Sequence, residues 1–179
     1  DPRAGAALPM PMPAPTPARV MALPTARVRK APPLTWRAGL PWPCAQVAIA
    51  VDTAFVAGAG DSPIASGIYL MDNQLNGGSS GEGSFGSLAS VVPVGSLVGY
   101  AAYPLDTGLG DQVAITGFSV VEGDVFGCAG YPIAQRPDYW IAQAMYLGSQ
   151  VYQIQLRITA GALRPTQFYV HVQATLRTC

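Results

Sequence analysis

Two segments near the end of the chain alternate between apolar and polar residues. The apolar positions of the first segment are Tyr152, Ile154, Leu156 and Ile158. Those of the second segment are Phe168, Val170, Val172, Ala174 and Leu176. A period of two is typical of a strand with one face in a core and the other in water. The pattern therefore predicts two antiparallel strands joined by a hairpin over 161–165.

Shorter apolar segments come earlier in the chain. They predict strands over 46–52, 67–71, 88–92, 96–103 and 113–121. Turn residues separate them: Pro93–Gly95, the link 103–110 and the glycine- and serine-rich segment 76–86. No window of twelve residues shows a helical stripe. We therefore expect an all-β protein with about seven to nine strands and under about 10% helix. Its fold class is an antiparallel β-sandwich, jelly-roll or immunoglobulin-like in architecture.

The first 43 residues have a different composition. They hold eleven of the seventeen prolines, and proline excludes both helix and central strand. We expect an extended arm over 1–43 and a sandwich domain over 44–179. A disordered tail is the alternative, but apolar residues such as Val20 and Leu23 favour packing on a surface.

Charge divides the chain in the same way. The formal net charge is zero, yet six of the ten cations precede residue 41, and nine of the ten acidic residues follow it. A basic arm can bind an anionic partner, or it can dock on the acidic body of its own or a neighbouring copy. We expect docking on a neighbouring copy, which would build a homo-oligomer or polymer. The arm residues assigned to this contact are Arg27, Arg29, Lys30, Leu34 and Trp36.

The sequence offers little catalytic chemistry. Its one histidine, His171, lies on the polar face of a predicted strand, away from any nucleophile and acid pair. Glu122 and Asp124 could help to bind a cation, but the aspartates mostly lie beside turns, where they bond the local backbone. We therefore expect no enzyme activity, no catalytic residue and no metal.

Residues Gly81–Gly86 match the pattern G-x-G-x-x-G found in nucleotide-binding loops. A kinase-type loop needs a lysine on the next strand, and the chain's one lysine, Lys30, lies upstream. The segment is interpreted as a loop between strands, without a cofactor.

Cysteine spacing predicts neither a disulfide framework nor a zinc site. Cys44, Cys128 and Cys179 are an odd number and far apart in sequence. A bridge between Cys44 and Cys128 stays open as an alternative. No apolar segment is long enough to span a membrane, so no membrane partner is expected.

The order of segments resembles the AidA/PixA inclusion-body protein family over residues 46–177. The resemblance rests on Val47–Thr53, Gly67–Met71, Val92–Tyr100, Val113–Phe118, Asp138–Trp140 and Val151–Leu156. Ser96 and Tyr100 depart from the family's usual Asp and Trp, and the arm is foreign to it. The resemblance implies a bacterial, non-enzymatic sandwich that accumulates in cytoplasmic inclusions.

Three functions compete on this sequence. The first is a self-assembling structural protein of the inclusion-body type, whose partner is itself. The second is a viral capsid protein, which the basic arm favours and which would bind nucleic acid; polyprotein cleavage would then explain a chain that starts at Asp1. The third is a secreted carbohydrate-binding sandwich, supported only by the aromatic residues Tyr139, Trp140, Tyr146 and Tyr152. For these four residues, core and cross-strand packing is the first interpretation.

Overall fold

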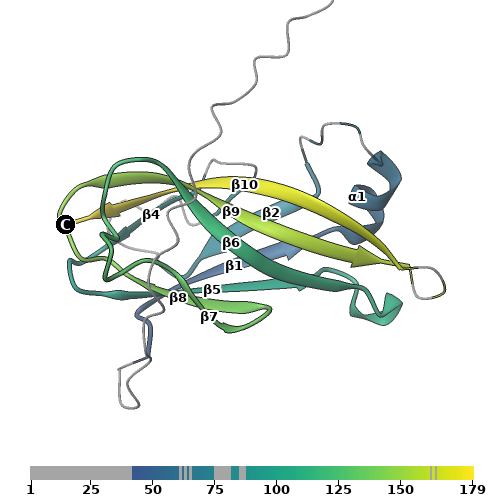
Figure 1. Cartoon of the computed structure of the whole chain (residues 1–179), viewed down its shortest axis with the longest axis horizontal. Helices are drawn as coiled ribbons and strands as arrows, with labels where there is room; N and C mark the ends of the chain where they lie inside the picture. The colour runs from purple at the N-terminus through teal and green to yellow at the C-terminus, as the bar shows by residue number, and fades with distance from the viewer. Residues whose placement is uncertain are drawn as a thin grey trace, which may run out of the picture.

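The computed structural model describes residues 42–60, 62, 64, 66–74, 82–84, 88–161, 163 and 165–179, and for 82–84 it describes the backbone. Within these ranges the chain forms two β-sheets that pack face to face (Figure 1). The strands are β1 (Ala45–Val51), β2 (Ile68–Asp72), β3 (Glu82–Ser84), β4 (Ala89–Val92), β5 (Leu97–Pro104), β6 (Gln112–Glu122), β7 (Ile133–Arg136), β8 (Tyr139–Gln143), β9 (Ser149–Ala160) and β10 (Thr166–Thr178). Two short helical segments complete them, α1 (Thr53–Ala59) and the 3-10 turn η1 (Thr107–Leu109).

The six-stranded sheet has the order β3-β2-β1-β5-β8-β7, and the four-stranded sheet has the order β4-β10-β9-β6. The predicted all-β sandwich is confirmed. Most neighbours are antiparallel, but β1 pairs with β5 and β4 with β10 in parallel. A parallel pair needs a long connection between its strands, and such a connection leaves no mark in a short sequence window.

The hairpin of β9 and β10 is the most regular part of the fold. Its register runs from Ala160 opposite Thr166 to Ser149 opposite Arg177, so the predicted link over 161–165 is confirmed. In β9 the alternate residues from Tyr152 to Ala160 are buried, and the residues between them are partly exposed. In β10 the apolar residues are fully buried from Val172 onward, whereas Phe168 and Val170 are only partly buried.

Three strands and one helix were not predicted. β3 has three residues in the segment expected to be a loop, and β7 is an edge strand with mostly exposed side chains, so neither has an apolar alternation. β8 is short and pairs between β5 and β7. With these strands the described residues hold ten, one more than the upper expectation. α1 has only seven residues, too few to show a helical stripe.

Aromatic side chains fill the space between the sheets. Tyr100 of β5 and Tyr152 of β9 are fully buried, with ring centroids 5.9 Å apart. Phe118 of β6 lies 4.9 Å from Tyr100 and 5.4 Å from Trp140 of β8, and Phe126 lies 5.5 Å from Tyr152. Edge-to-face contacts of this kind add to the burial of the rings and hold the two sheets together.

None of the helices described is long and apolar enough to cross a membrane.

Candidate functional site

Three links between strands meet at one end of the sandwich. They are the β1–β2 link with α1, the β5–β6 link with η1, and the β9–β10 link (Figure 1). Asp111, just before β6, joins two of them to its own link. Its carboxylate accepts hydrogen bonds from Thr53 Oγ1 at 2.5 Å and from the Gly161 backbone at 3.0 Å. The Asp111 carboxylate therefore connects all three links by hydrogen bonds.

α1 forms here because its ends are capped locally. The Asp52 carboxylate accepts from the Phe55 backbone at 2.9 Å, a typical N-cap contact, and Gly60 takes a positive φ of 57° at the C-cap. The helix TAFVAGA contains no charged residue. It buries Val56 against the sandwich and leaves Phe55 exposed.

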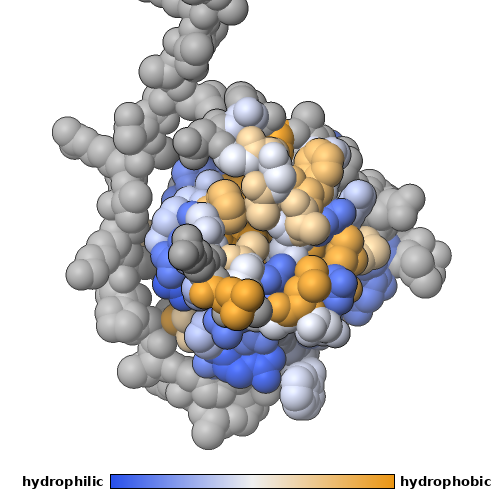
Figure 2. Space-filling view, turned by 90° about the vertical axis from the view of Figure 1, so that its right-hand side faces the viewer, coloured by the Kyte–Doolittle hydropathy of each residue, from blue (hydrophilic) through white to orange (hydrophobic). Residues whose placement is uncertain are grey.

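The same end carries exposed apolar side chains from all three links (Figure 2). We call Phe55, Leu105, Leu109 and Leu163 the apolar end. Leu105 and Leu109 keep about half of their surface exposed, and Leu163 at the hairpin tip keeps 98%. Contiguous exposed apolar surface on a soluble protein commonly marks an interaction site. The apolar end is therefore the candidate functional surface.

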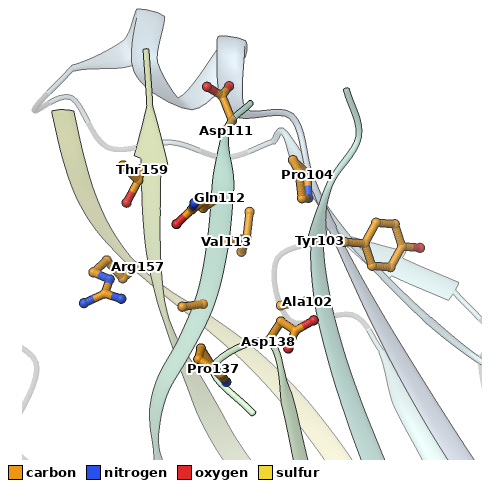
Figure 3. A pocket seen from close by; sticks show the side chains of 11 residues that line it. Ala102, Tyr103, Pro104, Asp111, Gln112, Val113, Pro137, Asp138, Arg157 and Thr159 are labelled. Atoms are coloured by element: carbon orange, nitrogen blue, oxygen red, sulfur yellow. The ribbon is translucent and has the colours of Figure 1, made fainter. Parts of the chain in front are cut away.

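A groove of about 440 Å³ lies beside the apolar end (Figure 3). It runs from the end of β5 past the start of β6 to the β7–β8 turn, with Arg157 and Thr159 of β9 on its other side. Figure 3 shows the Tyr103 ring pointing away from the groove, although Tyr103 belongs to its lining. A sugar platform needs an aromatic face turned toward the ligand, and this groove does not offer the Tyr103 ring in that way.

The groove lining contains no histidine, cysteine or lysine. Its charged groups are Asp111, Asp138 and Arg157, and Asp111 already caps two links. Asp138 pairs with Arg136 at 3.3 Å on the surface. Among the described residues, no hydrogen bond joins the Thr159 hydroxyl to Asp111 or Asp138.

The turn between β7 and β8 closes the side of the sandwich below the groove. The Pro137 carbonyl accepts from the Ile115 backbone of β6 at 2.8 Å, and the Asp138 carbonyl accepts from the Ala102 backbone of β5 at 2.9 Å. This turn is therefore hydrogen-bonded to one strand of each sheet, and these bonds fix Pro137 and Asp138 of the groove lining to the sandwich.

The residues singled out for chemistry are spread over the fold. His171 is exposed on the outer face of β10, and Glu122 and Asp124 are exposed at the other end from α1. Among the described residues, no three His, Cys, Asp or Glu side chains are close enough to hold a metal ion. Asp52 caps α1 and Asp106 caps η1, so both bond the local backbone, as predicted for aspartates beside turns.

Two predicted features are reached only in part by the structure. In the glycine-rich segment, Glu82–Ser84 pair with β2 as β3, while Gly81 and Gly86 lie outside the described residues. The arm contacts assigned to Arg27, Arg29, Lys30, Leu34 and Trp36 also lie outside them.

The aromatic residues of the C-terminal third do not form an exposed platform. Tyr152 is fully buried, and Trp140 packs against the core beside Phe118. Tyr139 lies under the Arg136 guanidinium, 5.6 Å from ring centroid to charge, whereas Tyr146 is exposed at the other end of the molecule. Packing, the first interpretation of these residues, accounts for Tyr152 and Trp140.

All three cysteines are free and exposed, so the alternative of a Cys44–Cys128 bridge is not realised in this structure. They lie at the end of the sandwich opposite α1. Cys44 precedes β1, Cys179 follows β10, and Cys128 lies in the β6–β7 link, which bonds to the segment after β8. Cys44 Sγ donates a weak bond to the Leu97 carbonyl at 3.6 Å.

The model of a protein family described as a domain of unknown function, DUF8788, matches residues 45–163. The chain belongs to this family. The match covers most of the sandwich of this DUF8788 protein and ends before β10. No curated protein matches its sequence.

The solved structure of an inclusion body protein, PixA, from Burkholderia cenocepacia is similar to the DUF8788 protein. The TM-score is 0.60 at 17% sequence identity, over 75% of this chain and 94% of the solved chain. At that identity the likeness shows a shared fold. It supports the resemblance drawn from the strand segments at the level of the fold, while the family that matches by sequence is DUF8788.

Proposed function

We propose that this protein is a non-enzymatic structural protein that assembles with copies of itself into inclusions in the bacterial cytoplasm. The apolar end carries the proposal, because three separate links present large apolar side chains to solvent there. The solved protein of similar fold is an inclusion body protein, which supports the same kind of role.

A second copy of the chain is the occupant that the charges favour. Only 11% of the residues are charged and the net charge is zero, so long-range repulsion between copies is weak. Asp106 and Asp111 lie in the same links, and both carboxylates accept hydrogen bonds within this end. An apolar surface meeting the same surface on another copy gains about 25 cal/mol for each Å² removed from water.

The groove supports a role without catalysis. Two of its charged groups are already used, Asp111 in capping and Asp138 in a surface ion pair, and its lining contains no histidine, cysteine or lysine. The alternative of a capsid protein becomes an outcome of the test.

The test is light scattering of the purified full chain over a concentration series, with electron microscopy and the ratio of absorbance at 260 and 280 nm. We expect particles whose mass grows with concentration and which contain no nucleic acid. Leu105→Lys combined with Leu109→Lys should shift the mass toward the monomer, because it places charge on the contact.

Leu147→Lys is the matched control, since Leu147 is exposed at the end opposite α1. It should assemble like the unchanged protein. A full chain that stays monomeric at every concentration would overturn the proposal. Closed shells that contain nucleic acid would establish a capsid protein instead.

A further inference from the structure

One edge of the four-stranded sheet is only partly covered. β4 pairs with β10 over Thr175–Thr178 and leaves the start of β10 without it (Figure 1). In the part of the chain that the structure describes, no strand pairs with Gln167–Gln173 on the side away from β9. We call Gln167–Gln173 the open edge.

The backbone of the open edge is oriented to accept another strand. Thr175 donates its N–H to the Leu88 carbonyl at 2.9 Å, so odd-numbered residues of β10 turn their backbone groups away from β9. Alternate residues of a strand point their N–H and C=O groups to the same side. The N–H and C=O groups of Tyr169 and His171 therefore point out of the sheet edge, as in proteins that bind a peptide by strand addition.

The side chains at this edge also indicate a missing neighbour. Phe168 and Val170 pack against the core but are only partly buried, whereas Val172 farther along the same face is fully buried. On the outer face, Tyr169 is 67% exposed. A strand added here would cover the apolar pair on its inner side.

We propose that Thr25–Lys30 of a second copy adds a strand to the open edge. This inference rests on the proposed self-assembly and names the segment that connects the copies. The six residues contain no proline and lie between Pro24 and Pro32. They alternate, with Ala26, Val28 and, at the end of the segment, Lys30 on one face and Thr25, Arg27 and Arg29 on the other. Ala26 and Val28 would pack on Phe168 and Val170. The arginines on the other face would lie beside Tyr169, whose ring can make a cation–π contact.

The direction of the chain favours a second copy over the same copy. The described chain begins at Trp42, which is 89% exposed at the end opposite α1, and β1 runs from there toward α1. A strand from the same chain would have to leave the open edge and reverse into β1 within residues 31–41. Pro32, Pro33 and Pro41 lie in that segment, and proline stiffens it against such a reversal.

The geometry of this contact favours an open polymer over a closed ring. The arm of one copy and the edge of the next are different surfaces, so each copy added offers both again. Such head-to-tail contacts give open polymers unless a rotation closes the ring. This agrees with an inclusion as the product.

Disulfide trapping in the full chain tests the contact. Cys44, Cys128 and Cys179 are first changed to Ser, which is feasible because all three are exposed. One protein then carries Arg27→Cys, and another carries Gln167→Cys, Tyr169→Cys, His171→Cys or Gln173→Cys. The two are mixed and oxidised. Directly opposite residues of paired strands come close enough for a disulfide, so at least one edge position should give a covalent dimer.

Gln155→Cys is the matched control. Gln155 lies on the same outer face but on β9, which has a strand on both sides. It should give no dimer with Arg27→Cys. Val28→Pro in the Arg27→Cys protein should abolish the dimer by removing a backbone donor from the added strand, while Ala7→Pro, outside Thr25–Lys30, should not. Dimers that form equally with Gln155→Cys, or that survive Val28→Pro, would overturn the proposal.

Two further results separate this inference from the proposed function. If a chain lacking residues 1–41 still assembles and no edge cysteine is trapped, the strand contact is wrong and self-assembly stands. If the full chain is monomeric, both fail. A protein with Arg27→Cys and Tyr169→Cys together that cross-links within one chain at high dilution would overturn the second copy as the source of the strand.

Discussion

The hydroxyl of Tyr100 donates a hydrogen bond to the hydroxyl of Tyr152 at 3.2 Å, in the middle of the core and between the two sheets. Both side chains are fully buried. Each hydroxyl therefore supplies a partner for a polar group that would otherwise be buried alone, and the pair links β5 to β9.

A double-mutant cycle on this pair should show strong coupling. Tyr100→Phe or Tyr152→Phe alone leaves one buried hydroxyl without its partner and should lower the free energy of unfolding by about 1–3 kcal/mol. The double variant should cost less than the sum of the two. Guanidinium denaturation measures all four proteins, with the exposed Tyr169→Phe as the control expected to stay within about 0.5 kcal/mol. Additive losses would contradict the coupling.

The same pair should make the protein sensitive to alkali. Burial raises the pKa of Tyr100 well above its ordinary value, and the neighbouring Tyr152 raises it further. Burial also raises the pKa of Tyr152, against a lowering by the hydrogen bond from Tyr100. A folded pKa above the unfolded value of about 10 means that this stability is fully present below pH ~10 and is lost as the pH rises toward the folded pKa.

The denaturant concentration at which half of the protein is unfolded should therefore decrease as the pH is raised from about 9 to about 11. This range spans the pKa of free tyrosine, about 10. The variant with Phe at both 100 and 152 should show a smaller fall. Some fall should remain, because burial raises the pKa of Tyr131 as well. An unchanged pH dependence in the double variant would exclude the buried pair as its source.

Gly123→Ala should destabilise the fold much more than Gly110→Ala. Both glycines have a positive φ, 82° and 72°, which costs about 1–2 kcal/mol for an alanine. At Gly123 a Cβ would also lie 2.1 Å from the Ser149 carbonyl oxygen, whereas nothing lies within 4 Å at Gly110. The clash with rigid backbone should add about 1–3 kcal/mol to the loss at Gly123, seen in thermal or chemical denaturation. Equal losses would contradict this.

Asp111→Ala should loosen the end that carries α1. The change removes the acceptor of the bonds from Thr53 and Gly161 and should cost about 2–4 kcal/mol in the free energy of unfolding. Hydrogen exchange should accelerate in α1 and in the β9–β10 link. Asp106→Ala is the control, because Asp106 accepts from Gly108 within its own link and should cost about 1 kcal/mol. Unaltered exchange in α1 would show that Asp111 does not hold it.

All three thiols should react in the native protein. Cys44, Cys128 and Cys179 are free and exposed, so a colorimetric thiol reagent should titrate as many thiols before denaturation as after it. A lower native count in freshly reduced protein would show that one of the three is covered in solution.

The sandwich itself could be predicted from the sequence because, in its two longest strands, the alternation of apolar and polar residues shows which face is buried. In β9 every second residue from Tyr152 to Ile158 is apolar, and each of these residues is buried. The link after Ala160 could be predicted for the same reason, since a period of two ends where glycine and proline begin. These are local properties, decided by neighbours in the chain.

What the sequence could not predict depends on residues far apart in the chain. β7 and β8 lack a clear alternation, and they are strands because their backbones pair with each other and with β5. α1 exists because Asp52 caps it and the sandwich covers Val56, and seven residues carry too little signal for that.

The candidate site divides in the same way. The sequence showed a composition poor in charge and rich in apolar residues, with no paired catalytic groups, and predicted a protein that is not an enzyme. That Phe55, Leu105, Leu109 and Leu163 share one end was decided by three links brought together by the strand order. The open edge of β10 was decided by the short reach of β4. Local pattern determines which face of a strand is buried, but only tertiary pairing determines which edges and ends of the sandwich are left uncovered.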